Sequence, residues 1–303
     1  MYRKILVGYD GRDQGDDALA LAKQLADATG AELVVAGVVQ YDPIWGGFDP
    51  AFRDADAEFS DKIRKAAKSI GAEAESVPAS SPARGLHERA AEIGADLIVV
   101  GSAKHGRLGQ LLAGNVGLAL LHGAPCAVAI APHGFRDREA EGITAVEVGF
   151  DGSEQAGLAL RAGIELARQA GATLKLVSVA EPPPVVIGSK DGASQGRQEF
   201  KEGIEDLRRE EVRDARELVP EGIDVKAIVV DGDPAESLAE VAKTPGTILV
   251  VGSRGYGPLR AVLLGSVSRE LIRQAPCPLI VQPRAKRDAS GRRSTKAEAK
   301  ALG

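Results

Sequence analysis

The chain has 303 residues, enough for two domains of ordinary size. Apolar residues make up 44% of it and aromatic residues only 4%, so the core must consist of Val, Ile, Leu and Ala, a mixture that suits parallel sheets covered by helices. Two cysteines are too few for a disulfide scaffold, and no apolar run is long enough to cross a bilayer. With a net charge of -5 and no export signal, the sequence predicts a cytoplasmic protein.

Short apolar runs alternate with segments of helical periodicity along the first half of the chain. Ala18, Leu21 and Leu25 lie on one face of the first predicted helix. Ile63 and Ala67 belong to a second apolar stripe of the same period. Between these helical segments the sequence predicts strands, namely 4–9, 32–39, 72–77, 96–101 and 126–131.

The second half of the chain repeats the first. Val-Gly-Tyr-Asp-Gly at 7–11 recurs as Val-Gly-Phe-Asp-Gly at 148–152, and Ala-Pro-Cys at 124–126 recurs at 275–277. The predicted strands of the second copy are 145–150, 174–179, 225–230, 247–252 and 279–282. Regular alternation of strands and helices implies right-handed crossovers. The sequence therefore predicts an α/β fold with two repeated Rossmann-like domains, each a five-stranded parallel sheet with helices on both faces.

Composition sets the limits of the two copies. A stretch rich in charge, with Pro and Gly, joins them at 132–142, so we predict domains at 1–132 and 142–283. The remaining segment, 284–303, carries seven basic and two acidic residues with almost no large apolar side chain, which predicts a disordered tail. Such a tail could touch nucleic acid, but a solubilising role is the simpler interpretation, and nucleic acid is not expected as a partner.

A glycine-rich loop follows the fourth predicted strand of the second copy, where ligands of open parallel sheets bind. Gly252 and Gly255 begin this loop, Arg254 adds positive charge, and Gly265 and Ser266 follow after nine residues. Glycines permit positive φ and let backbone N–H groups approach an anion, and the helix that resumes after the loop presents its positive end. The loop is therefore a candidate phosphate site, with a plain tight turn as the alternative.

The pattern G-x2-G-x9-G-[S/T], with Asp-Gly-Ser at 151–153 and Gly-Asp-Pro-Ala at 232–235, resembles the ATP-binding universal stress proteins. The resemblance covers residues 1–283 and implies that ATP, with or without Mg²⁺, lies across the strand ends. It implies that Asp151 contacts the nucleoside part and that the backbone of Val179 meets adenine. The phosphates would be held by Gly252, Ser253, Arg254, Gly255, Gly265, Ser266 and Val267.

The first copy departs from this pattern. Gly101 and Gly114 are kept, but Lys104 stands at the second glycine position and Asn115 at the Ser or Thr position. Lysine can neutralise phosphate yet lacks the backbone freedom of glycine, so we expect a weaker or differently filled site. The resemblance assigns this equivalent site to Asp10, Val38, Gly101, Lys104, Gly114 and Asn115.

The resemblance implies a stress-response regulatory protein in which ATP binding changes conformation or the choice of partner. The enzymatic alternative is slow ATP hydrolysis or phosphate transfer at the second-copy site. Against it, Asp151 and Asp233 are the only carboxylates that we could assign there as a base or as Mg²⁺ ligands. A third interpretation is a structural dimerisation module with vestigial sites.

The partners that we expect are an adenine nucleotide and an unidentified protein. The copies are predicted to pack as an internal pseudo-dimer, and a homodimer is compatible with this. The resemblance implies that strands 126–131 and 279–282 lie at the contact between the copies. The four histidines show no metal-ligand spacing, so no metal site and no catalytic residue are predicted.

Overall fold

The structure is a computed structural model that describes residues 2–40, 50–102, 115–181, 193–253 and 265–283. The first copy contains β1 (Lys4–Gly8), α1 (Asp13–Thr29), β2 (Glu32–Gln40), α2 (Pro50–Ser69), β3 (Glu73–Ala79), α3 (Pro82–Ile93), β4 (Leu97–Gly101), α4 (Asn115–Leu121) and β5 (Ala127–Ala131). A 3-10 helix, η1 (Phe135–Glu141), follows. The second copy contains β6 (Ala145–Gly149), α5 (Glu154–Ala170), β7 (Thr173–Ala180), α6 (Ala193–Glu217), β8 (Val225–Asp231), α7 (Pro234–Val241), β9 (Thr247–Gly252), α8 (Ser266–Gln274) and β10 (Leu279–Gln282).

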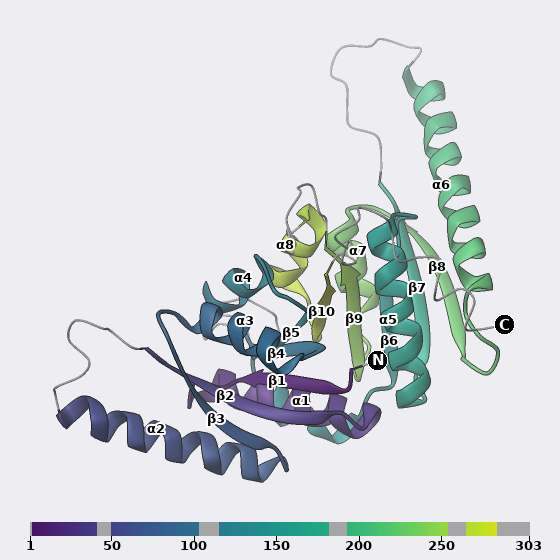
Figure 1. Ribbon diagram of the computed structural model, residues 1–303. Coiled ribbons are helices and arrows are strands. Elements are labelled where there is room, and N and C mark those ends of the chain that lie inside the picture. The colour runs from purple at the N-terminus through teal and green to yellow at the C-terminus, as the bar shows by residue number, and fades with distance from the viewer. Residues whose placement is uncertain (1, 41–49, 103–114, 182–192, 254–264, 284–303) are drawn as a thin grey trace, which may run out of the picture.

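All ten strands belong to one sheet, in the order β3-β2-β1-β4-β5-β10-β9-β6-β7-β8 (Figure 1). Within each copy every strand pair is parallel. The copies meet where β5 and β10 pair antiparallel, with Ile280 opposite Ala129. The predicted α/β fold with parallel five-stranded units is confirmed. The two units are halves of a continuous sheet, because the fifth strands pair along their edges.

Helices cover both faces of the sheet. One core cluster contains buried side chains of α1, α2, α5 and α6, and the other contains those of α3, α4, α7 and α8. Successive strand residues belong to opposite clusters: Ile5 and Val7 lie in the first and Leu6 in the second, all fully buried. This burial on both faces explains why the strands read as continuous apolar runs in the sequence.

The first helix of each copy ends at a glycine in the left-handed conformation. Gly30 has φ 71° and Gly171 has φ 63°, and each N–H group bonds back to a carbonyl oxygen of the last helical turn. Both positions are equivalent in the repeat. Each glycine ends its helix and turns the chain into the next strand.

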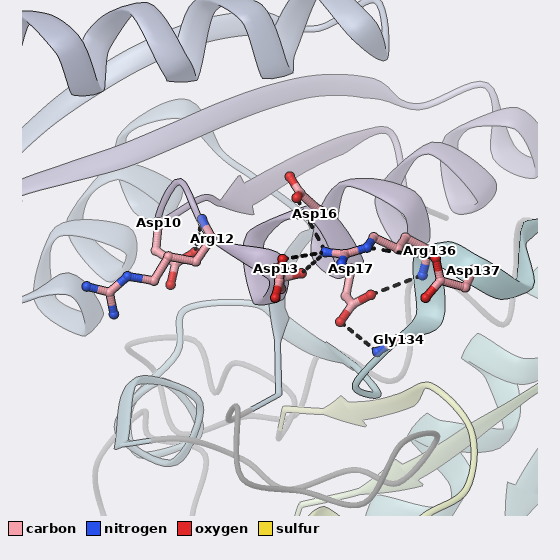
Figure 2. Close-up of polar contacts among 8 residues, drawn as sticks. All are labelled: Asp10, Arg12, Asp13, Asp16, Asp17, Gly134, Arg136 and Asp137. Carbon is pink, nitrogen blue, oxygen red and sulfur yellow. Dashed lines mark hydrogen bonds and ion pairs between the residues drawn. The ribbon is translucent and has the colours of Figure 1, made fainter.

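The linker between the copies is anchored to α1. Asp17 is only 1% exposed, and its carboxylate accepts hydrogen bonds from the backbone N–H groups of Gly134, at 2.9 Å, and Arg136, at 3.0 Å. The guanidinium of Arg136 reaches the carboxylates of Asp13 and Asp16 in the first turn of the same helix (Figure 2). The linker thus has a defined path across the first copy.

Candidate functional site

A cavity of about 590 Å³ lies beyond the carboxyl ends of β6, β7 and β9. The chain order of the sheet reverses between β6 and β9, which is where open α/β sheets bind ligands. Side chains from the first turns of α5, α7 and α8 complete the walls. The predicted second-copy residues that line this cavity are Asp151, Val179, Gly252, Gly265, Ser266 and Val267.

A tight turn at the end of β6 positions Asp151. Its Oδ1 atom accepts a hydrogen bond from the backbone N–H of Ser153 at 3.1 Å. Gly152 has φ 74°, and a Cβ atom there would lie 2.5 Å from a carboxylate oxygen of Glu211. The position therefore favours glycine for its backbone conformation, and a larger residue would also displace the Glu211 carboxylate of α6.

Three helices present their first turns to the cavity, and their caps differ. Ser153 caps α5 by accepting from the N–H of Ala156 at 3.1 Å. Asp233 caps α7 by accepting from the N–H groups of Ala235 and of the next residue at 2.9 and 3.0 Å. Gly265 is the N-cap of α8 and supplies no side-chain hydrogen bond. Among these three helices, α8 therefore leaves its first-turn N–H groups without a side-chain cap, and such groups attract anions.

The structure describes two glycines of the predicted phosphate loop, Gly252 and Gly265, and neither has a positive φ. Gly252 is not in the left-handed region, and Gly265 has φ -67°, so neither needs the positive φ inferred from the sequence. A Cβ atom on Gly252 would lie 2.5 Å from the carbonyl oxygen of Gln155, and one on Gly101 would overlap the carbonyl oxygen of Gln14. These two strand-end glycines are thus required because the first turn of α5 or α1 packs directly on the strand.

The other predicted residues of the second copy are placed as follows. Ser253 is 1% exposed and its backbone N–H donates to the carbonyl oxygen of Gln282 at 3.0 Å, continuing the pairing of β9 with β10. Its side chain does not line the cavity. Arg254 and Gly255 lie outside the described residues.

In the first copy, Asp10 forms the same turn as Asp151, with Oδ1 accepting from the N–H of Arg12 at 3.1 Å. Val38 is half-buried in β2, and Gly101 ends β4. Asn115 is the first residue of α4. Lys104 and Gly114 lie outside the described residues, so the structure leaves their predicted role untested.

Sequence reasoning missed Arg208, a lining residue contributed by α6. Its Nη1 atom donates to the carbonyl oxygen of Asp151 at 3.1 Å and to Glu211 at 2.6 Å. The residue stands 57 positions after Asp151 and belongs to no motif. The repeat gave no signal for it, because α2, the corresponding helix of the first copy, places Phe59 and Lys62 beside the equivalent turn.

The remaining charged side chains of the described lining are all carboxylates. They belong to Asp151, Glu181, Asp233, Glu236 and Glu270. An anionic ligand in this cavity would therefore need compensating positive charge from Arg208, from the positive end of α8 or from a bound cation.

Comparisons with known proteins agree with the fold. The universal stress protein family model matches residues 1–132 and 143–283. A universal stress protein of Mycobacterium tuberculosis (strain H37Rv) is 27% identical over 304 residues, covering 92% of this chain and 99% of that protein. One from Bacillus subtilis (strain 168) is 31% identical over 140 residues, which cover 44% of this chain and 95% of that protein. The crystal structure of a universal stress protein from Archaeoglobus fulgidus has a TM-score of 0.64 at 20% identity, covering 93% of this chain and 98% of that one.

Within the described residues, no helix combines the length and apolar character needed to span a membrane.

Proposed function

The chain belongs to the universal stress protein family, and we propose that its second copy binds an adenine nucleotide, ATP by the motif that it carries. The observation that carries this proposal is the cavity, which is lined by six residues that the family resemblance assigned to the nucleotide site. These residues come from the ends of three strands and the start of α8, so only the folded chain brings them together.

The roles of these residues follow from their chemistry. The first-turn N–H groups of α8, at Ser266 and Val267, would hold phosphate oxygens, because they have no side-chain cap and lie at a positive helix end. Val179, at the end of β7, would meet the adenine ring. Asp151 is exposed and lines the cavity, so its carboxylate could accept hydrogen bonds from the ribose hydroxyls.

The acidic lining affects how a cation such as Mg²⁺ would bind in the cavity. Among the described residues, no group of three or more His, Cys, Asp and Glu side chains could hold a metal ion by itself. Carboxylate oxygens do suit Mg²⁺, which commonly binds through one or two carboxylates together with phosphates. Mg²⁺ would therefore enter with the nucleotide, and it would neutralise part of the phosphate charge that Asp151 and Glu270 repel.

We favour a regulatory role, in which the occupied site changes conformation or partner choice, over catalysis. A hydrolase would need a carboxylate free to orient water or take up a proton. The sequence offers Asp151 and Asp233 as candidate bases. One oxygen of Asp233 already accepts two backbone N–H groups as the cap of α7. Slow ATP hydrolysis remains the alternative, and a single-turnover assay with radiolabelled ATP separates it from binding alone.

The direct test is mass spectrometry of the full chain under native conditions, after purification without added nucleotide. We expect a fraction of the protein to carry a mass that equals an adenine nucleotide, released on denaturation and identified by chromatography. Absence of bound nucleotide, combined with no heat of binding at millimolar ATP, would rule out the proposal.

A further inference from the structure

One arginine reaches the cavity from a helix that the nucleotide motif does not include. Arg208 lies in α6, and its side chain is 24% exposed. Nη1 bonds to the carbonyl oxygen of Asp151 and to the carboxylate of Glu211. These two bonds hold the guanidinium beside the turn that follows β6, at the edge of the cavity.

The opposite edge of this guanidinium makes no hydrogen bond to the described residues. Both bonds that Arg208 makes within the described part of the chain start at Nη1. Nε is buried and has no hydrogen-bond partner there. The Nε and Nη2 donors form a planar fork, and such a fork matches two oxygens of one phosphate group. An incoming phosphate would supply an acceptor to Nη2, and also to the buried Nε once the side chain shifts to open that atom.

The charge of the described lining opposes an anion, so attraction to a phosphate has to come from Arg208 itself. Arg208 is the single cationic side chain in the described lining, opposite five carboxylates. The ion pair with Glu211 keeps it extended toward the Asp151 turn, so its position is set before a ligand arrives. A fixed guanidinium binds an anion at a smaller entropic cost than a flexible side chain does.

In the described part of the first copy, the helix side chains beside the equivalent turn carry no guanidinium. A Cβ atom on Gly11 would lie 3.4 Å from the ring of Phe59 and 3.7 Å from the side chain of Lys62 in α2. Phe59 and Lys62 have the same spacing of three as Arg208 and Glu211 in α6, and each pair flanks the Asp-Gly turn of its own copy. The two copies therefore offer different chemistry at equivalent positions.

We propose that Arg208 is a ligand-binding residue that makes the second-copy cavity select phosphorylated over unphosphorylated ligands. The fork of Nε and Nη2 donates to two oxygens of one phosphate group, while Nη1 keeps its bond to the carbonyl oxygen of Asp151. This inference rests on the proposed function, because it names how the same cavity recognises its ligand. It also gives the two copies different ligand preferences, independently of the glycine loops.

The test is calorimetric titration of the full chain with ATP and, separately, with adenosine. Arg208→Gln removes the charge and the fork, and Arg208→Lys keeps the charge alone. Arg209→Gln is the matched control, because Arg209 is 59% exposed, pairs with Glu205 and Asp206, and does not line the cavity. We expect Arg208→Gln to weaken ATP binding about tenfold or more, Arg208→Lys to weaken it less, and neither to change adenosine binding.

Two results would overturn the inference: unchanged ATP affinity in Arg208→Gln, or an equal loss for adenosine and ATP, which would indicate a merely structural role. Thermal denaturation without ligand checks that the variants fold, and Arg208→Lys provides the comparison if the glutamine variant does not. If the unmodified chain binds no ATP, the proposed function fails and the inference with it. If it binds ATP but is insensitive to Arg208→Gln, the inference fails alone.

Discussion

At the scale of single residues, Glu147 is the least expected member of the core. It lies fully buried in the middle of β6, at the position that Leu6 occupies in β1. Within the described residues its carboxylate oxygens have no hydrogen-bond partner. Lys175 stands opposite in β7, but its Nζ atom donates to Thr244 at 3.0 Å. Burial raises the pKa of Glu147 to about 8, and Lys175 offsets only part of this.

This buried carboxyl predicts how stability depends on pH. Its folded pKa, about 8, lies above its unfolded value of 4.5, so between these values the unfolded state loses a proton that the folded state keeps. Stability from this group is full below pH 4.5 and is lost as pH rises toward 8, on the order of 3 to 5 kcal/mol. Glu147→Leu should remove this slope and stabilise the protein at pH 8, as urea unfolding at pH 5 and 8 measures. An unchanged slope in the variant would contradict the assignment.

Residue roles were predictable only where a motif carried them. Asp151 and Ser266 were found because the spacing of the motif survives in the sequence, and the folded chain brings both to one cavity. The reason for Gly252 was not predictable, because it depends on the carbonyl oxygen of Gln155, a contact made only in the folded sheet. Arg208 was missed for the same reason: nothing local relates it to the turn that it touches.

Among the helices and strands, the uncapped start of α8 is a place where one substitution should affect helix stability and ligand binding in opposite directions. Ser266 is exposed at the first position of this helix and lines the cavity. Ser266→Asp places a negative charge at a positive helix end, which should leave thermal stability equal or raise it by about 0.5 kcal/mol. The same charge should repel phosphate and weaken ATP binding at least tenfold. Ser266→Asn is the neutral control, and similar ATP affinities in both variants would exclude phosphate from this position.

The linker makes a second prediction at this scale. The carboxylate of Asp17 is buried and accepts two backbone N–H groups of the linker, at Gly134 and Arg136. Asp17→Ala leaves both donors without this partner, so it should lower the free energy of unfolding by about 2 to 4 kcal/mol. Asp13→Asn, at a half-exposed carboxylate that pairs with the same arginine, should cost less than about 1 kcal/mol. If chemical denaturation showed the same loss of unfolding free energy in both variants, burial of Asp17 would not explain its contribution to stability.

Elements were easier to predict than the contacts between them. All ten predicted strands are present with ends within two residues, because each is an apolar run between helical segments. The anchoring of the linker was not predictable. It depends on Asp17, whose counterpart in the second copy is Leu158, so the repeat gave no second example of the contact.

At the scale of the whole molecule, the join between β5 and β10 makes one sheet out of two. The residues of β5 are 0 to 2% exposed in the full chain, and the strand would become an edge if β10 were removed. A fragment of residues 1–142 keeps the linker but exposes this apolar edge, which is a template for pairing with another chain. We expect it to dimerise or to be less stable than the full chain in sedimentation and denaturation experiments. A stable monomeric fragment would contradict this view of the join.

The parallel order within each copy followed from the alternation of strands and helices, which permits few other topologies. The antiparallel join did not follow from local sequence. Family resemblance implied that the fifth strands lie at the contact, but it gave neither their pairing nor its direction, which depend on how two separate sheets meet.

We expect the second copy, with its intact motif, to be the stronger nucleotide site. Calorimetric titration of the unmodified full chain with ATP tests it most directly. We expect two unequal sites or a single one, with the tighter site lost in Ser266→Asp. Two equal and independent sites, or a tight site that survives this substitution, would contradict it.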